Sequence, residues 1–344
     1  MDINDIKKYD TKNVFGSIDL FYKQCRDSWN NTNYTPNNIK VNKILIIGMG
    51  GSALGAHIIE SLNILTVPIT VCHDYHIPQW VNDETLVVAV SYSGGTEETL
   101  SATVEAIDSG TTVVGITAGG KLAEMLNEKP IPVCLIDTKN NPCGQPRFGV
   151  GAMMMCLLKI FFAHNLCTLS KKQIENSINE LSEWRNGKSK IALAEIYERV
   201  KLLKDTIIVL VYAEHLANVG RFVRNQIHET AKTLALAHEI PELNHHLMEG
   251  LEFPEENKKL LQFIFLESDL YSDKIKERYA ITKDVLEKQG IKYYGAKIDG
   301  ETLLAQALIA MLRGMYFAYA LSFVHQKDPS EIPWVNYFKE EMGK

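Results

Sequence analysis

Short apolar runs alternate with helical patterns along the first half of the chain. The runs are rich in Val and Ile, and each precedes a loop or a segment with apolar residues at helical spacing. The predicted strands lie at residues 43–48, 67–78, 85–90, 111–117 and 131–138. Because buried β-branched runs between helices are typical of parallel sheets, this half predicts a parallel sheet with helices on both faces.

The same plan returns in the second half, after an apolar helix at 141–166 and a polar helical stretch at about 170–203. The predicted elements that follow are strands at 205–213, 260–268 and 291–299, and helices at 214–238, 273–290 and 302–326. The last helix is apolar enough either to form a subunit interface or to pack inside its own domain. We therefore expect an N-terminal helical segment at 1–37, a first α/β domain at 38–155 and a second at 156–344 with C-terminal helices.

Composition agrees with a globular protein of two domains, since the chain has 344 residues, of which 46% are hydrophobic and 23% charged. The net charge of -6 argues against a general nucleic-acid or membrane-surface binder. The polar start of the chain predicts no export signal, and no long uncharged apolar run predicts a transmembrane helix. Six scattered cysteines are typical of reduced thiols, so we expect a cytoplasmic protein.

The first predicted crossover carries a glycine loop, GMGGSALG. Gly48, Gly50 and Ala53 have the spacing G-x-G-x-x-A directly after a strand, and Asp74 follows about twenty residues later. This is the fingerprint of a dinucleotide site, so an NAD(P)-binding oxidoreductase is one hypothesis. Glycine is also favoured in a tight crossover that binds no ligand. The motif therefore fits either a dinucleotide site or a purely structural turn.

The third strand leads into a richer loop, SYSGGTEETL, at residues 91–100. Ser91, Ser93 and Thr96 precede a predicted helix, and the free N–H groups of a helix N-terminus attract anions. Thr96 alone would be only a helix cap. Three hydroxyls and two glycines favour a phosphate site, and a nicotinamide enzyme would need its phosphate site at the first crossover instead.

An acid and several histidines gather between residues 224 and 250. Glu229 lies in a predicted helix near Arg224 and Lys232, so it is either an ion-pair partner on the surface or a catalytic group. Asn244, His245 and His246 follow in a predicted loop. Because histidine titrates near neutral pH, loop histidines beside an acid are candidates for proton transfer.

A metal site is the competing interpretation of this segment. Its possible ligands are His228, His238, Glu242, His245 and His246. No HExxH motif and no familiar ligand spacing occurs among them, which argues against metal binding here. The other histidines show no clustering in the sequence, and we expect them to be structural or exposed: His57, His73, His76, His164, His215 and His325.

Six motifs, in this order and spacing, resemble the archaeal-type bifunctional phosphoglucose/phosphomannose isomerases: GMGGSALG, SYSGGTEETL, GITAGGKLAE, PRFGVG, NQIHETAK and PELNHH. The resemblance runs from about residue 40 to the C-terminus. It implies two flavodoxin-like sugar-isomerase (SIS) domains, a tight homodimer and no cofactor. The implied activity converts glucose 6-phosphate, and mannose 6-phosphate, to fructose 6-phosphate through a cis-enediol.

The resemblance also assigns roles to individual residues. It places the phosphate loop at Ser91, Ser93 and Thr96 and the sugar loop at Gly50, Gly51 and Ser52. It gives the catalytic base to Glu229, ring opening to His245 of the partner subunit with Lys339, and enediolate stabilisation to Arg147.

Some positions depart from the family pattern. His228 precedes the base, Ala231 lies two residues after it, and His246 stands where the family often has Asn. Ser330 lies near where we expect a Thr. None of these changes removes a catalytic group. They bear instead on the pKa of the base and on substrate preference. The alternative from another class is an SIS-domain sugar-phosphate sensor, although the N-terminal segment offers no basic helix pair for DNA binding.

Overall fold

The computed structural model describes residues 8–37 and 39–343, and the chain forms two compact units. We call Gly16–Ser182 the N-terminal unit, and the described parts of residues 1–15 and 183–344 the C-terminal unit. The boundary expected at residues 155 and 156 lies within helix α7 (Val150–Ala163). A division into family domains at that point stays a prediction.

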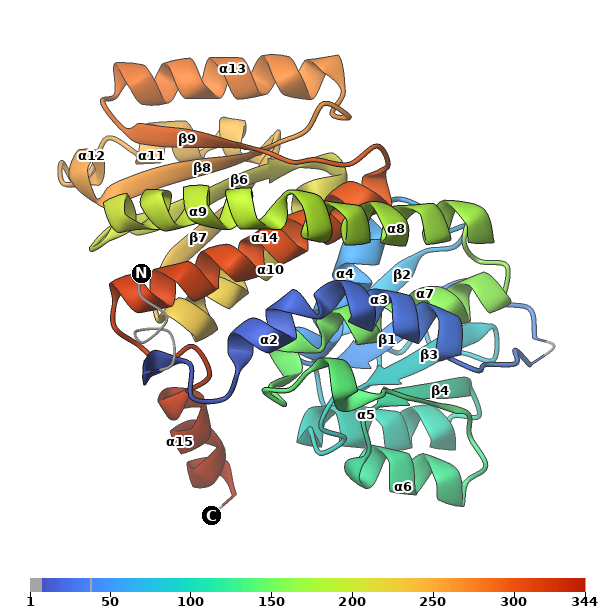
Figure 1. Cartoon of the computed structure of the whole chain (residues 1–344). Helices are drawn as coiled ribbons and strands as arrows, with labels where there is room; N and C mark the ends of the chain where they lie inside the picture. The colour runs from blue at the N-terminus through green and yellow to red at the C-terminus, as the bar shows by residue number, and fades with distance from the viewer. Residues whose placement is uncertain (1–7, 38, 344) are drawn as a thin grey trace. The chain divides into compact units, whose positions relative to one another are not determined.

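The N-terminal unit is built on one parallel sheet, as the apolar runs predict (Figure 1). Its strands are β1 (Lys43–Gly48), β2 (Ile69–Cys72), β3 (Thr85–Val90), β4 (Thr112–Thr117) and β5 (Val133–Leu135), in the order β2-β1-β3-β4-β5. Its helices are α3 (Phe21–Asn31), α4 (Gly51–Ser61), α5 (Glu97–Asp108), α6 (Gly120–Glu128) and α7, and the unit begins within α2 (Val14–Asp19).

Both faces of this sheet are covered, which explains why its strands are apolar without alternation. On one face, Leu45 and Val87 pack with Ala102 of α5 and Leu122 of α6 in a buried cluster. Strand residues between them, such as Val88, point to the opposite face and are also fully buried. The central strands are therefore held rigidly, and so are the starting points of the loops that leave them.

The C-terminal unit repeats the same topology with four parallel strands (Figure 1). They are β6 (Ile207–Ala213), β7 (Ala235–Ile240), β8 (Leu261–Glu267) and β9 (Lys292–Lys297), in the order β7-β6-β8-β9. Helix α8 (Lys171–Gly187) follows α7 and crosses the boundary between the units at Ser182. The later helices are α9 (Ser189–Val200), α10 (Ala217–Gln226), α11 (Leu247–Gly250), α12 (Asn257–Leu260), α13 (Asp273–Lys288), α14 (Leu303–Val324) and α15 (Pro333–Met342). In each unit the second strand of the chain lies at one edge, next to the first.

The single helix predicted at 214–238 is wrong in its second half. Helix α10 ends at Gln226, residues 227–231 form a π-helical turn, and Lys232 takes a left-handed backbone conformation with φ of 54°. This conformation stops a helix, because its geometry does not propagate in L-residues. The residues beyond it form β7, which pairs in parallel with β6.

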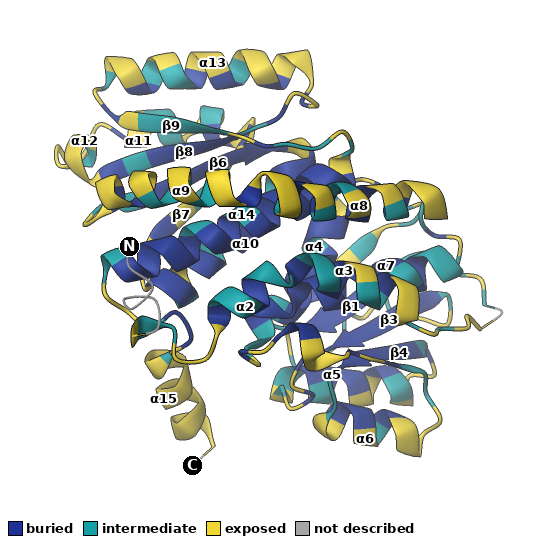
Figure 2. Cartoon of the chain, in the orientation of Figure 1, coloured by how far each residue is buried: buried dark blue, intermediate teal, exposed yellow. Residues whose placement is uncertain are grey.

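Helix α14 is long and apolar enough, by length and composition, to cross a membrane. However, 83% of its most apolar window is buried within the structure, and α9 and α10 pack against it. Figure 2 shows α14 as buried over most of its length. The helix is therefore a core element of its own unit, the second of the two roles expected from its sequence.

Gly220 allows α10 to approach the sheet closely, and this contact generates a test. A Cβ atom at Gly220 would lie 1.8 Å from Cδ1 of the buried Tyr212. Overpacking costs about 1–3 kcal/mol, more than the roughly 1 kcal/mol that alanine gains in helix propensity. We expect Gly220→Ala to lower the free energy of unfolding in denaturant titrations by about 1–2 kcal/mol. The control Gly187→Ala, at the end of α8 with open space around its Cβ position, should not. Equal stability of the two variants would contradict the close approach.

Candidate active site

The loops after β1 and β3 leave neighbouring strands at the centre of the first sheet. In open α/β sheets, ligands bind outside the carboxyl ends of the strands where the strand order reverses. The order β2-β1-β3-β4-β5 is the flavodoxin-like one and differs from the usual dinucleotide-binding order 3-2-1-4-5-6. The fold thus brings the predicted sugar and phosphate loops together and counts against the oxidoreductase hypothesis.

The predicted phosphate loop opens helix α5 and presents hydroxyl groups there. The Oγ atom of Ser91 lies 3.0 Å from Oγ1 of Thr96, Ser91 is buried and Ser93 is exposed. Thr96 occupies the N-cap position, but its side chain makes no capping hydrogen bond. The first-turn N–H groups have no partner within the helix, and the helix dipole adds positive potential. This end of α5 therefore has the character of an anion site.

The sugar loop is tied directly to the phosphate loop. The backbone N–H of Tyr92 donates to Oγ of Ser52 over 3.2 Å, and Ser52 is buried. Gly51 lies against the backbone of Arg147, since a Cβ atom at Gly51 would be 3.2 Å from Cα of Arg147. Gly50 precedes them with φ of 50°, a conformation that favours glycine. The predicted residues of this unit, from three separate segments, therefore lie together.

Tyr92 supports this arrangement, a role that no local pattern around it predicts. Its ring fills the space beside Gly149, where a Cβ atom would lie 2.3 Å from Cε2 of the ring. Its hydroxyl accepts a hydrogen bond from Nδ2 of Asn141 over 2.9 Å. Burial raises the pKa of Tyr92, so the phenol stays neutral at physiological pH. Tyr92 thus connects the phosphate loop to the PRFGVG segment.

Arg147 lies in a short 3-10 turn, Pro146–Phe148, and is only 4% exposed. Its Nη1 atom donates to Oε1 of Gln145 over 3.2 Å, and its guanidinium lies 5.0 Å from the centre of the Phe148 ring. These contacts fix the orientation of a positive charge that cannot be neutralised at physiological pH. A fixed buried cation is the kind of group that stabilises a developing oxyanion.

In the C-terminal unit, Glu229 lies in the π-helical turn between α10 and β7. Such turns are rare and frequently occur at functional sites. Glu229 is half-buried in the wall of a cavity of about 660 Å³, which Lys232, Asp328 and Trp334 also line. Glu229 thus lines a space large enough for a small ligand.

Two side chains hold the turn that carries Glu229. The Nζ atom of Lys232 donates to the carbonyl oxygen of Thr230 over 3.1 Å and also to the carbonyl oxygen of Asp328. The ring of His228 lies within hydrogen-bonding distance of the Ala235 backbone, at 2.9 Å from its oxygen and 3.1 Å from its nitrogen. The unusual His228 therefore bonds to the start of β7, and Lys232 links the turn to the segment before α15.

His245 lies far from Glu229 within one chain. Glu229 comes before the first residue of β7, whereas His245 ends a 3-10 turn that begins after its last residue. The six residues of this strand span about 20 Å. His245 is exposed, and so is His246, whose ring centre lies 6.3 Å from that of His238. Burial lowers the pKa of His238, as does the charge of His246. The structure therefore does not bring the predicted acid and histidine together in one chain.

Lys339 lies on α15, whose first residues line the cavity beside Glu229. Six residues of helix place it about 9 Å further along the helix axis than Pro333. Lys339 is exposed, and so are the aromatic residues Trp334, Tyr337 and Phe338 of the same helix. Lys339 itself is not among the residues that line this cavity.

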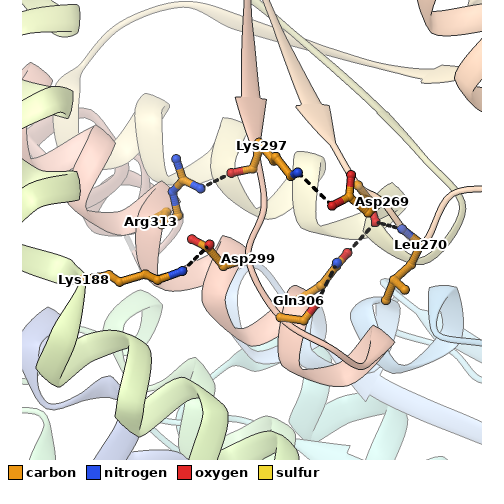
Figure 3. A network of polar contacts seen from close by, with 9 residues as sticks. Lys188, Asp269, Leu270, Lys297, Asp299, Gln306 and Arg313 are labelled. Carbon is orange, nitrogen blue, oxygen red and sulfur yellow. Dashed lines mark hydrogen bonds and ion pairs between the residues drawn. The ribbon is translucent and has the colours of Figure 1, made fainter.

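The carboxyl edge of the second sheet is occupied by the chain's own polar groups (Figure 3). Lys297 pairs with Asp269 over 2.8 Å, and Lys188 pairs with Asp299 over the same distance. At the start of α13, the carboxylate of Glu214 accepts hydrogen bonds from the Ser272 N–H and, over 2.6 Å, from its hydroxyl. This edge corresponds to the phosphate loop of the first sheet, but an internal carboxylate lies at its helix N-terminus.

Comparison with known proteins extends these observations. A family model described as the bacterial phospho-glucose isomerase C-terminal SIS domain matches residues 196–342. A bifunctional phosphoglucose/phosphomannose isomerase of Thermoplasma acidophilum is 31% identical over 303 residues, which cover 87% of this chain and 89% of the relative. One of Aquifex aeolicus is 31% identical over 310 residues, 88% of this chain and 90% of the relative. A D-glucosamine-6-phosphate 4-epimerase of Sulfolobus acidocaldarius is 28% identical over 240 residues, 69% and 71% of the two chains.

Solved structures share the architecture at much lower identity. A hypothetical protein of Thermus thermophilus superposes with a TM-score of 0.69 and 16% identity, covering 96% of this chain and 89% of its own. The C-terminal domain of a glucosamine-fructose-6-phosphate aminotransferase from Francisella tularensis gives a TM-score of 0.68 and 14% identity, over 92% and 95% of the two chains. At these identities the likeness concerns the fold, and it confirms the predicted α/β plan with two parallel sheets.

The contact between Tyr92 and Gly149 can be tested without reference to activity. A methyl group at Gly149 must displace the Tyr92 ring, so Gly149→Ala should lower the free energy of unfolding by about 1–3 kcal/mol. In a Tyr92→Ala background the same substitution should cost much less, because the obstructing ring is gone. Denaturant titrations of the four proteins in this cycle measure the coupling. An equal cost in both backgrounds would show that the ring does not press on Gly149.

Proposed function

The chain belongs to the bifunctional phosphoglucose/phosphomannose isomerase family, and we propose that it interconverts glucose 6-phosphate and mannose 6-phosphate with fructose 6-phosphate. The observation that carries this proposal is the relationship to an isomerase at 31% identity over 87% of the chain, because a match of that length spans both units. The chain is therefore an isomerase. We also propose that it works in the cytoplasm, where sugar phosphates are metabolised.

The reaction moves one proton between neighbouring carbons and needs no hydride acceptor. A base takes the proton from C2 of the open-chain aldose and returns it to C1, while the proton on O2 passes to O1. We assign the base to Glu229, because its carboxylate lines a cavity on a turn that Lys232 holds in place. For mannose 6-phosphate the configuration at C2 is reversed, so one base serves both substrates only if C2 rotates relative to C3.

The intermediate is a cis-enediolate, whose negative charge requires a fixed positive partner. Arg147 is the proposed partner, since it is buried and held by Gln145 and Phe148. A preorganised charge of this kind stabilises the intermediate without the cost of reorienting solvent.

The phosphate takes no part in the chemistry, and its proposed role is to anchor the substrate. Ser91, Ser93 and Thr96 would bind it at the N-terminus of α5, with Gly50, Gly51 and Ser52 beside the sugar. Binding energy from a group that does not react can be used to hold C1 and C2 in position for proton transfer.

Ring opening requires a second acid and base pair, which we assign to His245 and Lys339. Because about 20 Å of strand separates Glu229 from His245 in one chain, these two residues would act on one substrate only from different subunits. We therefore propose a homodimer in which the partner's His245 completes the site. The exposed position of His245 supports this arrangement.

Direct assay tests the proposed activity. Glucose 6-phosphate and mannose 6-phosphate should each yield fructose 6-phosphate in a coupled assay, with D-glucosamine 6-phosphate as a comparison substrate because one relative is a 4-epimerase. Glu229→Gln should reduce turnover by at least about 10³-fold, since it removes the base while keeping the size of the side chain. Wild-type turnover in this variant would overturn the assignment of the base. Absence of turnover with both hexose phosphates in the wild-type protein would favour the sensor hypothesis, provided that they still bind.

Mixing two inactive variants tests the shared site. Glu229→Gln and His245→Ala should each be inactive as homodimers. After dissociation and random reassociation, half of the dimers are mixed, and each mixed dimer has one of its two sites intact, so about a quarter of wild-type activity should return. If each chain used its own histidine, the mixture would remain inactive.

A further inference from the structure

His57 of α4 and His73, which follows β2, form a pair that the sequence did not reveal. Their Nε2 atoms lie 3.2 Å apart, and their ring centres are 5.4 Å apart with an interplanar angle of 36°. Sixteen residues separate them in the chain, so only the parallel pairing of β1 with β2 brings them together.

The Nδ1 atoms of both rings lie near hydrogen-bond acceptors. Nδ1 of His73 lies 2.8 Å from the carbonyl oxygen of Gly48, and Nδ1 of His57 lies 3.4 Å from a carboxylate oxygen of Glu60. A carbonyl or carboxylate oxygen only accepts, so both Nδ1 atoms carry their protons when these bonds form. The two Nε2 atoms then direct lone pairs toward each other, which is favourable only with a cation shared between the rings.

The spacing suits a transition-metal ion as well as a proton. Two imidazole ligands at 2.0–2.1 Å from a tetrahedral Zn²⁺ ion have their nitrogens about 3.3–3.4 Å apart. The observed separation of 3.2 Å is close to this value, so a small rotation of the rings would direct both Nε2 atoms at one ion. Metal-bound histidines usually donate their other N–H to a carboxylate or a carbonyl oxygen, which are the two partners found here.

We propose that His57 and His73 bind one divalent transition-metal ion, such as Zn²⁺, through their Nε2 atoms. Glu60 and the carbonyl group of Gly48 orient the two rings, and water completes the coordination. His73 is exposed and the His57 side chain is 13% exposed, so the ion has access from solvent. Within residues 8–37 and 39–343, no group of three or more His, Cys, Asp or Glu side chains has the geometry of a metal site. The site therefore has two protein ligands and exchanges its ion readily. It is independent of the proposed isomerase activity.

Occupancy should stabilise the N-terminal unit, because the ion links α4 to the end of β2 and, through His73, to the last residue of β1. A ligand that binds only the folded state raises its stability in proportion to the logarithm of ligand concentration. The effect is measurable as a shift of the thermal unfolding midpoint.

The proposal can be tested by titrating the full-length protein with ZnCl₂ in competition with a chromophoric chelator. The protein should carry no affinity tag. The wild-type protein should bind one ion per chain with a raised thermal midpoint. His57→Gln and His73→Gln should each lose this ion, and Glu60→Gln should weaken its binding on the order of tenfold. His76→Gln is the matched control, since His76 is an exposed histidine nearby that lies 3.2 Å from Glu105 instead.

The comparison of variants separates this site from other zinc-binding groups. Ions held by cysteine would remain in His57→Gln, so only the difference from wild type is assigned to the pair. Circular dichroism in the presence of chelator identifies any variant that fails to fold, and Glu60→Gln then provides the second measurement. Equal Zn²⁺ stoichiometry and affinity in wild type, His57→Gln and Glu60→Gln, or no stoichiometric binding by the wild type, would overturn the proposal.

Discussion

The hydrogen bond from the Tyr92 amide to the Ser52 hydroxyl joins the two loops to which we assign substrate binding in the N-terminal unit. It forms because β1 and β3 are adjacent parallel strands, whose carboxyl ends meet at one edge of the sheet. Ser52 lies in the first turn of α4, and Tyr92 lies between two serines of the phosphate loop. Any shift of one loop therefore moves the other. The buried ring of Tyr92 extends the constraint to Gly149, so that sugar loop, phosphate loop and the segment after Arg147 hold one another.

The C-terminal unit uses the same sheet topology for a different purpose. Its corresponding helix N-terminus, at α13, meets the carboxylate of Glu214 rather than a set of hydroxyls. A carboxylate of the chain competes with any external anion for the same N–H groups. The chemistry assigned to this unit instead comes from the amino end of β7, where the π-helical turn presents Glu229. Repetition of a fold thus does not repeat a site, because the loops differ.

Much of this architecture follows from the sequence, and the exceptions have physical causes. The strands of the first sheet are continuous apolar runs because both faces are buried, so their positions could be predicted. Ser91 and Thr96 are close in the chain and share one loop, so an anion site could be predicted there from the sequence alone. β7 was missed because the helical segment ends at the left-handed conformation of Lys232, and lysine carries no local signal for that conformation. His57 and His73 meet only through strand pairing, which no local pattern encodes.

The proposed base depends on Lys232 as well as on the carboxylate of Glu229, because Lys232 holds the turn that carries it. A π-helical turn is less stable than the α-helix before it, so a base placed on it needs support from elsewhere in the fold. Lys232 provides this support through two carbonyl oxygens, one within the turn and one at Asp328. Although burial opposes it, hydrogen bonds from Ser330 and Thr11 lower the pKa of Asp328, so its carboxylate is charged at physiological pH and accepts bonds from both residues. The same segment continues into α15, which carries Lys339. One lysine side chain thus joins the turn that carries Glu229 to the segment that leads to Lys339, and its loss would disturb both.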